Sequence, residues 1–153
     1  MPNIVISIPE GILPPASKHQ LVARLNVVAA EVEQIGDDPR SRAMCWILIE
    51  EIAKGNWTCG SADATDMAIP VLAVIHLPSG VLDEDARSRY AAGVHEAIIA
   101  ALPGEKRRIL TSCMFNEVDD GYWSINGKLW ALKDFARHAG FRHLQHLVET
   151  QPT

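Results

Sequence analysis

The sequence contains an internal repeat, and this feature constrains the fold of the chain more than any other. The segment PEGIL at residues 9–13 recurs as PSGVL at residues 78–82, and EIAKGNWT at residues 51–58 recurs as EVDDGYWS at residues 117–124. In both copies, apolar residues recur at helical spacing between the two motifs. Ordered matches over this length predict two copies of one structural unit.

Each copy is typical of a strand, a helix and a second strand. The predicted strands are short apolar runs, at residues 4–8 and 44–49 in the first copy and at residues 71–75 and 109–115 in the second. A helix between two strands favours a parallel pair with a right-handed crossover. We therefore predict an α/β (α+β) fold, in which two tandem β-α-β units form one four-stranded sheet with two helices on one face.

The predicted domain organisation is a single domain over residues 1–153. The first unit covers residues 1–62, the second covers residues 67–127, and a C-terminal tail covers residues 128–153. The tail alternates apolar and basic residues and is interrupted by Gly140. We therefore expect one broken helix or two short helices that pack on the body or on a neighbouring copy, with Trp130 anchoring their start.

Composition narrows the classes of function. The net charge is −5 and the basic residues are scattered, which argues against a nucleic-acid partner. The longest apolar stretch, at residues 67–77, is too short to span a bilayer, and no signal peptide is evident, so we expect a cytoplasmic protein without a membrane partner. Three cysteines without a CxxC pair and histidines without a zinc spacing predict no disulfide, no metal and no cofactor.

One combination of motifs is more specific. The chain begins Met1-Pro2, and the first unit ends with Glu51, Ala53, Lys54, Gly55 and Trp57 at fixed spacing. A β-α-β unit with these features resembles the 4-oxalocrotonate tautomerase family of the tautomerase superfamily. The doubled length is similar to its fused two-unit members, such as the cis-3-chloroacrylic acid dehalogenase and malonate semialdehyde decarboxylase groups. The resemblance implies the tautomerase fold and a homotrimer.

The resemblance also implies a chemistry for Pro2. Removal of Met1 would leave a secondary amine at a strand terminus, in a partly apolar pocket where desolvation and nearby cations can lower its pKa. Such an amine can act as a general base or acid on a small keto or enol carboxylic acid. Pro70, at the start of the second unit, has an amide nitrogen, so we expect one competent site per chain.

Other functions stay open. Within the superfamily, the alternatives are a dehalogenase, a hydratase or a decarboxylase. A different class of function is a catalytically degenerate protein of this fold that serves binding or assembly. Proline in second position is also compatible with a plain strand start, where the missing N–H is harmless. If Met1 is retained, the proline nitrogen is an amide and cannot be a base, which favours the binding protein.

Family tautomerases hold the substrate carboxylate with arginines, because the guanidinium group can bind both carboxylate oxygens. The matching positions here carry Ile12 and Trp46. Arg40 and Arg42 lie near the Trp46 position and could serve instead. The best replacements are Arg42, Arg107 and Arg108, each near the start of a second strand, and Lys54 matches a family position. The departure from the family pattern indicates a different substrate or a different clamp.

Aromatic residues complete the candidate site. Trp57 matches a family aromatic that forms an apolar wall near the proline, and Trp123 is its partner in the repeat. In a trimer, second-half residues of one subunit can complete the pocket of another. Trp46 is a candidate for the same cavity, while His76 and Tyr122 are weaker candidates, for which a core or surface role is the more common alternative.

Overall fold

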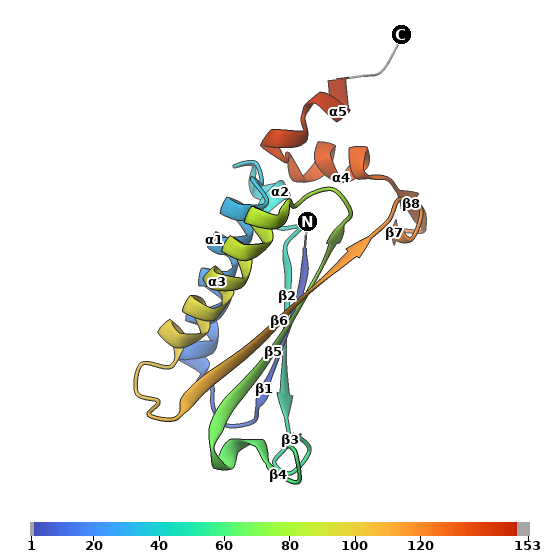
Figure 1. Cartoon of the computed structure of the whole chain (residues 1–153). Helices are drawn as coiled ribbons and strands as arrows, with labels where there is room; N and C mark the ends of the chain where they lie inside the picture. The colour runs from blue at the N-terminus through green and yellow to red at the C-terminus, as the bar shows by residue number, and fades with distance from the viewer. Residues whose placement is uncertain (1, 150–153) are drawn as a thin grey trace.

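The computed structural model describes residues 2–149. Four strands form one sheet in the order β2-β1-β5-β6, with bounds β1 (Asn3–Pro9), β2 (Trp46–Ile52), β5 (Ala68–Pro78) and β6 (Arg108–Val118). β1 is parallel to β2 and β5 is parallel to β6, while β1 and β5 are antiparallel and join the two units (Figure 1). The predicted sheet of two tandem β-α-β units is confirmed.

Two long helices cover one face of the sheet, as predicted (Figure 1). They are α1 (Pro15–Val32) and α3 (Glu84–Ala101). Pro15 begins α1, where the missing N–H of proline is no loss. Asp83 caps α3 by accepting a hydrogen bond from the Ala86 N–H at 2.7 Å. Both helices bury an apolar stripe, which explains the helical periodicity in both repeats.

The core lies between this helical layer and the sheet. Ile4, Ile6 and Ile8 alternate along β1 and are completely buried, as expected for side chains that point to one face of a strand. They pack with Leu21 and Leu25 of α1, which are also completely buried. The repeat therefore produces a continuous core in which each unit contributes two strands and one long helix.

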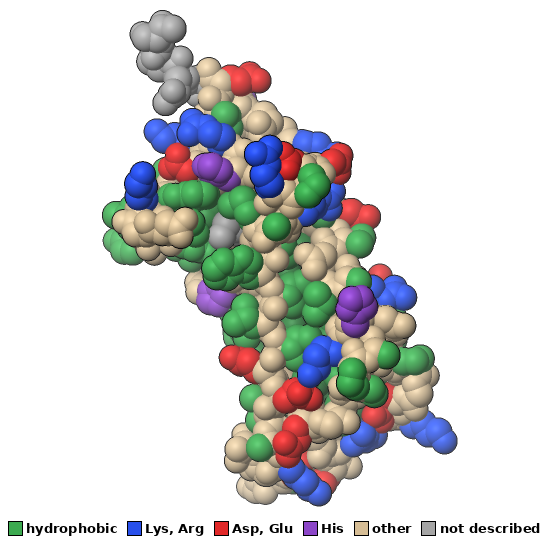
Figure 2. All heavy atoms as spheres, turned by 180° about the vertical axis from the view of Figure 1, so that it is seen from behind, with side chains coloured by type: hydrophobic (Ala, Val, Ile, Leu, Met, Phe, Trp, Pro, Cys, Tyr) green, Lys and Arg blue, Asp and Glu red, His purple; other side chains and the backbone are tan. Residues whose placement is uncertain are grey.

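The opposite face of the sheet carries apolar side chains that stay exposed in the described protomer. Trp46 and Leu48 on β2 and Leu110 and Met114 on β6 are all more than two-fifths exposed, with Trp46 at 57%. Figure 2 shows hydrophobic side chains gathered along the middle of the molecule. A sheet face with this many exposed apolar residues is typical of an interaction surface.

The segment between the two units is a small hairpin of β3 (Thr58–Cys59) and β4 (Ala62–Asp63), followed by the short 3-10 helix η1 (Ala64–Asp66). A second hairpin, β7 (Trp123–Ile125) and β8 (Lys128–Trp130), follows β6. Neither hairpin is predicted by the sequence patterns. The short helix α2 (Pro39–Arg42) lies between α1 and β2.

The C-terminal tail forms α4 (Leu132–Ala139), the 3-10 helix η2 (Arg142–Leu144) and α5 (His146–Glu149). Gly140 ends α4 with a left-handed φ of 63°, which confirms the predicted interruption. Trp130 contacts Phe135 with a ring-centre distance of 5.0 Å, which confirms it as an anchor. The Gly36 N–H donates to the Ala139 carbonyl at 3.0 Å, so the tail packs on the body beyond the end of α1.

Met1 and residues 150–153, which belong to the predicted first unit and tail, lie outside the described residues. Within residues 2–149, no helix has the combination of length and apolarity that crossing a bilayer requires. The described residues also contain no group of three or more His, Cys, Asp or Glu side chains placed to hold a metal ion.

Candidate active site

Pro2 lies at the start of β1, one of the two central strands. It is buried, and its carbonyl accepts a hydrogen bond from the Trp46 N–H at 3.0 Å. A proline tolerates this position because its ring nitrogen has no N–H to contribute to the ladder. The first residue of the predicted site is therefore held between β2 and β5, at one end of the sheet.

A row of four side chains crosses the sheet next to Pro2. The strand register aligns Trp46, Asn3, His76 and Asn116, one from each strand. The Asn116 amide Nδ2 lies 2.9 Å from Nδ1 of His76. Oδ1 of Asn3 is one of two buried side-chain polar atoms that find no hydrogen-bond partner among the described residues. This end of the sheet thus carries polar groups able to bind a ligand.

Two cavities adjoin this row and share Asn3 and Trp123. One has a volume of about 360 Å³ and is also lined by Trp46, Met44 and Arg40. The other has a volume of about 270 Å³. Its lining adds His76 and Tyr122 to the shared residues. The centre of the Trp123 ring lies 5.2 Å from that of Phe135, so α4 of the tail supports the wall between the cavities.

Arg42 is engaged outside these cavities. Its Nη2 lies 2.7 Å from Oδ1 of Asp37, and its Nε donates to the Gly36 carbonyl at 2.9 Å. Arg40, by contrast, lines the larger cavity with an exposed side chain. The Arg40 guanidinium group binds the Asp38 carboxylate through two nitrogens, which lowers the pKa of Asp38 from its usual value. Arg40 is therefore the arginine that the structure brings to the Pro2 end.

Three sequence-predicted residues lie at the other end of the sheet. β2 runs parallel to β1 and ends where Pro9 pairs with Ile52, so Lys54 and Trp57 follow at the end remote from Pro2. Arg108 begins β6 and pairs with Ala68, also at the remote end. Figure 1 shows β3 and β4 far from the N-terminus and the β7-β8 hairpin on the same side as the N-terminus.

At the remote end, a third cavity of about 120 Å³ is lined by Lys54, Arg107 and Glu10. The Lys54 N–H donates to Oε1 of Glu10 at 2.9 Å. Within one protomer the predicted set thus divides into two groups. Pro2, Trp46 and Trp123 come together, whereas Lys54, Trp57 and Arg108 lie apart from them.

The sequence patterns do not identify Asn3 and Asn116 as site residues, and they rank His76 and Tyr122 low. Asn3, His76 and Asn116 belong to no motif, and Tyr122 lies within the repeated segment at residues 117–124. Their proximity follows from the antiparallel pairing of Asn3 with His76 and the parallel pairing of His76 with Asn116. These residues could be found from the sequence by pairing the first strand of one repeat with the first strand of the other in antiparallel orientation.

The two partly buried thiols are poor candidates for nucleophiles. Burial raises the pKa of Cys45 to about 12 and that of Cys113 to about 11. A raised pKa keeps a thiol protonated at neutral pH, and the thiolate is the reactive form.

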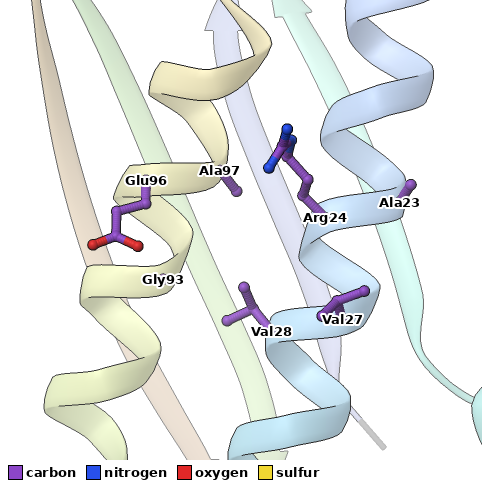
Figure 3. Close-up of a pocket in the computed structure, with 7 residues that line it drawn as sticks. All are labelled: Ala23, Arg24, Val27, Val28, Gly93, Glu96 and Ala97. Carbon is purple, nitrogen blue, oxygen red and sulfur yellow. The ribbon is translucent and has the colours of Figure 1, made fainter.

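A further cavity of about 340 Å³ lies between α1 and α3 (Figure 3). Val28 of α1 points toward Gly93 of α3, and a Cβ added at Gly93 would lie 2.8 Å from Cγ1 of Val28. The charged residues in the lining are Arg24 and Glu96. The cavity contains no residue of the Pro2 end, so we assign it to helix packing and not to the candidate active site.

No protein-family model and no curated protein matches the sequence. Solved structures, however, share the fold. Pt0534, solved after inactivation by 2-oxo-3-pentynoate, is 15% identical, with a TM-score of 0.68 over 84% of this chain and 95% of its own. A wild-type fused 4-OT, solved as an asymmetric trimer, is 16% identical, with a TM-score of 0.66 over 83% of this chain and 94% of its own.

Macrophage migration inhibitory factor of Toxoplasma gondii is also similar. It is 16% identical, with a TM-score of 0.61 over 84% of this chain and 99% of its own. Matches that span nearly the whole of each relative include both repeats, so the likeness extends beyond a single β-α-β unit. The chain therefore has the fold of the tautomerase superfamily, in the two-unit form of the fused 4-OT proteins.

Proposed function

We propose that this chain is an enzyme of the tautomerase type, in which Pro2 becomes the N-terminal residue and its amine transfers a proton on a small keto or enol carboxylic acid. One observation carries the proposal. Pro2 is buried at the start of a central strand, next to Asn3. Asn3 and Trp123 line two cavities, of which the larger is also lined by Trp46 and the smaller by His76. This arrangement occurs on the fold of the fused 4-OT proteins.

The physical chemistry of this end of the sheet suits proton transfer. Pro2 is buried, so its secondary amine is desolvated, and desolvation disfavours the protonated, charged form of the amine. A proton donor or acceptor works best when its pKa is near the pH of operation. The two cavities together offer room for a small organic acid.

The same site offers groups for the substrate carboxylate and carbonyl. Arg40 is the arginine in the lining of the larger cavity, and a guanidinium group can bind both carboxylate oxygens. To bind substrate, Arg40 must exchange its contacts with Asp38 for the ligand. Asn3 and His76 offer hydrogen-bonding groups for a substrate oxygen on the other side of Trp123.

We further propose a homotrimer. The fused 4-OT structure is described as a trimer, and the exposed apolar residues of the open sheet face, Trp46, Leu48, Leu110 and Met114, give this chain a surface to bury. In such an assembly, Lys54, Trp57 and Arg108 act at the Pro2 site of a neighbouring subunit. Their separation from Pro2 within one protomer then agrees with their proposed roles in substrate binding.

Three measurements test the enzymatic proposal in order. Intact mass should show a chain that lacks Met1. Incubation with 2-oxo-3-pentynoate, which inactivates Pt0534, should then add one molecule of label to Pro2. Ketonisation of phenylenolpyruvate should be catalysed by the wild type and reduced by at least about 100-fold in Pro2→Ala, as expected for the loss of a general acid or base.

Ser7→Ala provides a control on the same strand, because Ser7 lies toward the other end of β1 and bonds to Glu50. This variant should keep the wild-type rate. A native chain that retains Met1, or equal rates for the wild type and Pro2→Ala, would reject Pro2 as the base. Either result would favour the alternative of a binding or assembly protein on this fold.

A further inference from the structure

His76 and Asn116 form a side-chain pair across β5 and β6. Nδ2 of the Asn116 amide lies 2.9 Å from Nδ1 of the His76 ring. An amide nitrogen carries hydrogens and cannot accept, so it donates and Nδ1 accepts. A histidine ring that accepts at Nδ1 carries its hydrogen on Nε2. The contact with Asn116 therefore makes His76 a hydrogen-bond donor through Nε2.

Nε2 of His76 is available to a ligand. The ring makes no other hydrogen bond among residues 2–149. His76 is half-buried and lines the smaller cavity together with Asn3, Tyr122 and Trp123. An N–H group in a cavity wall, with no partner inside the protomer, can donate to an oxygen atom of a bound molecule.

Asn3 supplies a second donor to the same cavity. Its Oδ1 is buried and has no hydrogen-bond partner among the described residues. Nδ2 is therefore the polar atom through which this side chain can reach a ligand, and it donates. Asn3 lies directly opposite His76 in the antiparallel pair. Opposite side chains of such a pair share one face, with Cβ atoms about 4.5–5.5 Å apart, so both donors can reach one atom.

We propose that Nε2–H of His76 and Nδ2–H of Asn3 together bind the carbonyl oxygen of a 2-oxo acid, with Asn116 as the positioning residue of His76. This inference rests on the proposed function and adds to it, because it names the substrate group and the side chains that bind it. N–H donors fixed around an oxygen at which negative charge develops stabilise the transition state more than the ground state.

The arrangement of the two cavities favours a 2-oxo acid as the ligand. Asn3 and Trp123 line both cavities, and Arg40 lines the larger one. A ligand that spans the shared lining can place its carboxylate toward Arg40 and the adjacent carbonyl oxygen toward Asn3 and His76. The rings of Trp123 and Tyr122 in the smaller cavity suit an apolar or aromatic substituent.

The two donors stabilise charge and transfer no proton themselves. In the ketonisation of an enol acid, the enol hydroxyl loses its proton to water, and the electron pair of that bond stays on the oxygen of the enolate. His76 and Asn3 stabilise this negative charge. The substrate carbon then takes a proton from the Pro2 ammonium, and the amine regains one from water, so protons and charge balance.

Calorimetric titration with benzoylformate tests the two donors without turnover, because this 2-oxo acid has no hydrogen next to its carbonyl group. Phenylacetate has the same ring and carboxylate, with a CH2 group in place of the carbonyl. The wild type should bind benzoylformate at least about fivefold more tightly, the factor for two neutral hydrogen bonds. Asn3→Ala and His76→Ala should each lower this ratio of affinities by about 2- to 10-fold.

A ratio near one in the wild type, or no measurable binding of either acid, would overturn the inference. Ser112→Ala is the control, since Ser112 is exposed on β6, the strand of Asn116, and lines neither cavity. This variant should keep the wild-type ratio. The wild-type comparison of the two acids decides alone if a variant fails to fold.

Asn116→Leu tests the positioning role, because leucine is similar in size and cannot donate to Nδ1 of His76. In the wild type at about pH 8, where a histidine in water is neutral, nitrogen-15 NMR should show a hydrogen on Nε2 and none on Nδ1. The His76 signals are those missing in His76→Ala. Asn116→Leu should shift the Nδ1 signal and lower the affinity ratio by about 2- to 10-fold. A hydrogen on Nδ1 in the wild type, or an unchanged signal and ratio in Asn116→Leu, would reject the role of Asn116.

The failure of this inference differs from the failure of the proposed function. A ratio near one, together with loss of ketonisation in Pro2→Ala, would reject the two donors and keep Pro2 as the reacting group. A retained Met1 with the wild-type ratio intact would reject proton transfer by Pro2 and keep His76 and Asn3 as a carbonyl-binding pair. Loss of both ratio and activity in His76→Ala, with loss of activity alone in Pro2→Ala, supports both proposals.

Discussion

Asn3 on β1 and His76 on β5 lie opposite each other in the antiparallel pair that joins the two repeats. The row continues to Asn116 on β6, whose amide nitrogen lies 2.9 Å from the His76 ring. Because of this join, the end of the second unit reaches the beginning of the first. The Pro2 end is therefore built from both repeats within one protomer.

The first prediction concerns His76. His76→Ala removes a ring that lines the smaller cavity and contacts Asn116. A hydrogen bond to a charged group is worth about 1.5–3 kcal/mol, so kcat/KM for ketonisation should fall by about 10- to 100-fold. Steady-state kinetics on the purified variant measures the effect. His95→Ala is the control, because His95 lies on α3, contacts Thr111 of β6 and lines neither cavity. Equal losses of kcat/KM in both variants would contradict the prediction.

The repeat predicts the sheet, the helical layer and the broken tail, because these depend on periodicity and turn residues that occur twice. It does not predict which tryptophan lies at the Pro2 end of the sheet. Trp57 follows β2 in a motif that resembles the family, yet β2 is parallel to β1, so its end lies beside Pro9. Trp123 follows β6, whose end lies beside that of β5 and hence near the start of β1. The directions of the strands decide which tryptophan lies near Pro2, and the sequence motif does not specify those directions.

Arg40 shows a second limit of sequence reasoning. Arg40 and Arg42 are two residues apart on one short helix, and the sequence favours Arg42. The structure separates them, because Arg42 binds Asp37 and the Gly36 carbonyl, while Arg40 lines the larger cavity. A four-residue helix directs side chains two positions apart to different sides, and only three-dimensional contacts show which side meets the cavity.

The second prediction concerns the reactivity of the thiols. The raised pKa values of Cys45, about 12, and Cys113, about 11, mean that both stay protonated at pH 8 and lose their protons only as the pH approaches these values. Cys59 is exposed. Iodoacetamide at pH 8 should therefore label Cys59 in the native protein and all three cysteines after unfolding, as measured by peptide mass spectrometry. Rapid labelling of Cys45 in the native protein would contradict the prediction that burial keeps this thiol protonated.

The third prediction concerns helix packing. Gly93→Ala would place a Cβ 2.8 Å from Val28, and overpacking of this kind destabilises a core by about 1–3 kcal/mol. The free energy of unfolding, measured in urea, should fall accordingly. Gly104→Ala is the matched control, since no atom lies within 4 Å of its added Cβ. The double variant Val28→Ala/Gly93→Ala should recover part of the loss, because the two side chains are in direct contact. Additive losses would contradict the packing argument.

The last prediction concerns Arg108, which lies at the end of β6 remote from Pro2 in its own protomer. If Arg108 binds substrate at the Pro2 site of a neighbouring subunit, Pro2→Ala and Arg108→Ala should each be inactive alone. Trimers formed by refolding an equal mixture should regain about a quarter of the wild-type activity, because random assembly pairs an intact Pro2 with an intact neighbouring Arg108 in about one site in four.

Two further measurements make the outcome of this experiment decisive. Mixing the folded variants without refolding should give no activity if subunits do not exchange, which controls for carry-over of wild-type protein. Pro2→Ala mixed with His76→Ala should regain no activity beyond the residual rate of His76→Ala, since Pro2 and His76 serve one site in one protomer. A refolded mixture of Pro2→Ala and Arg108→Ala that stays inactive would place Arg108 outside the shared site and leave Arg40 as the proposed carboxylate-binding arginine, within the lining of the larger cavity.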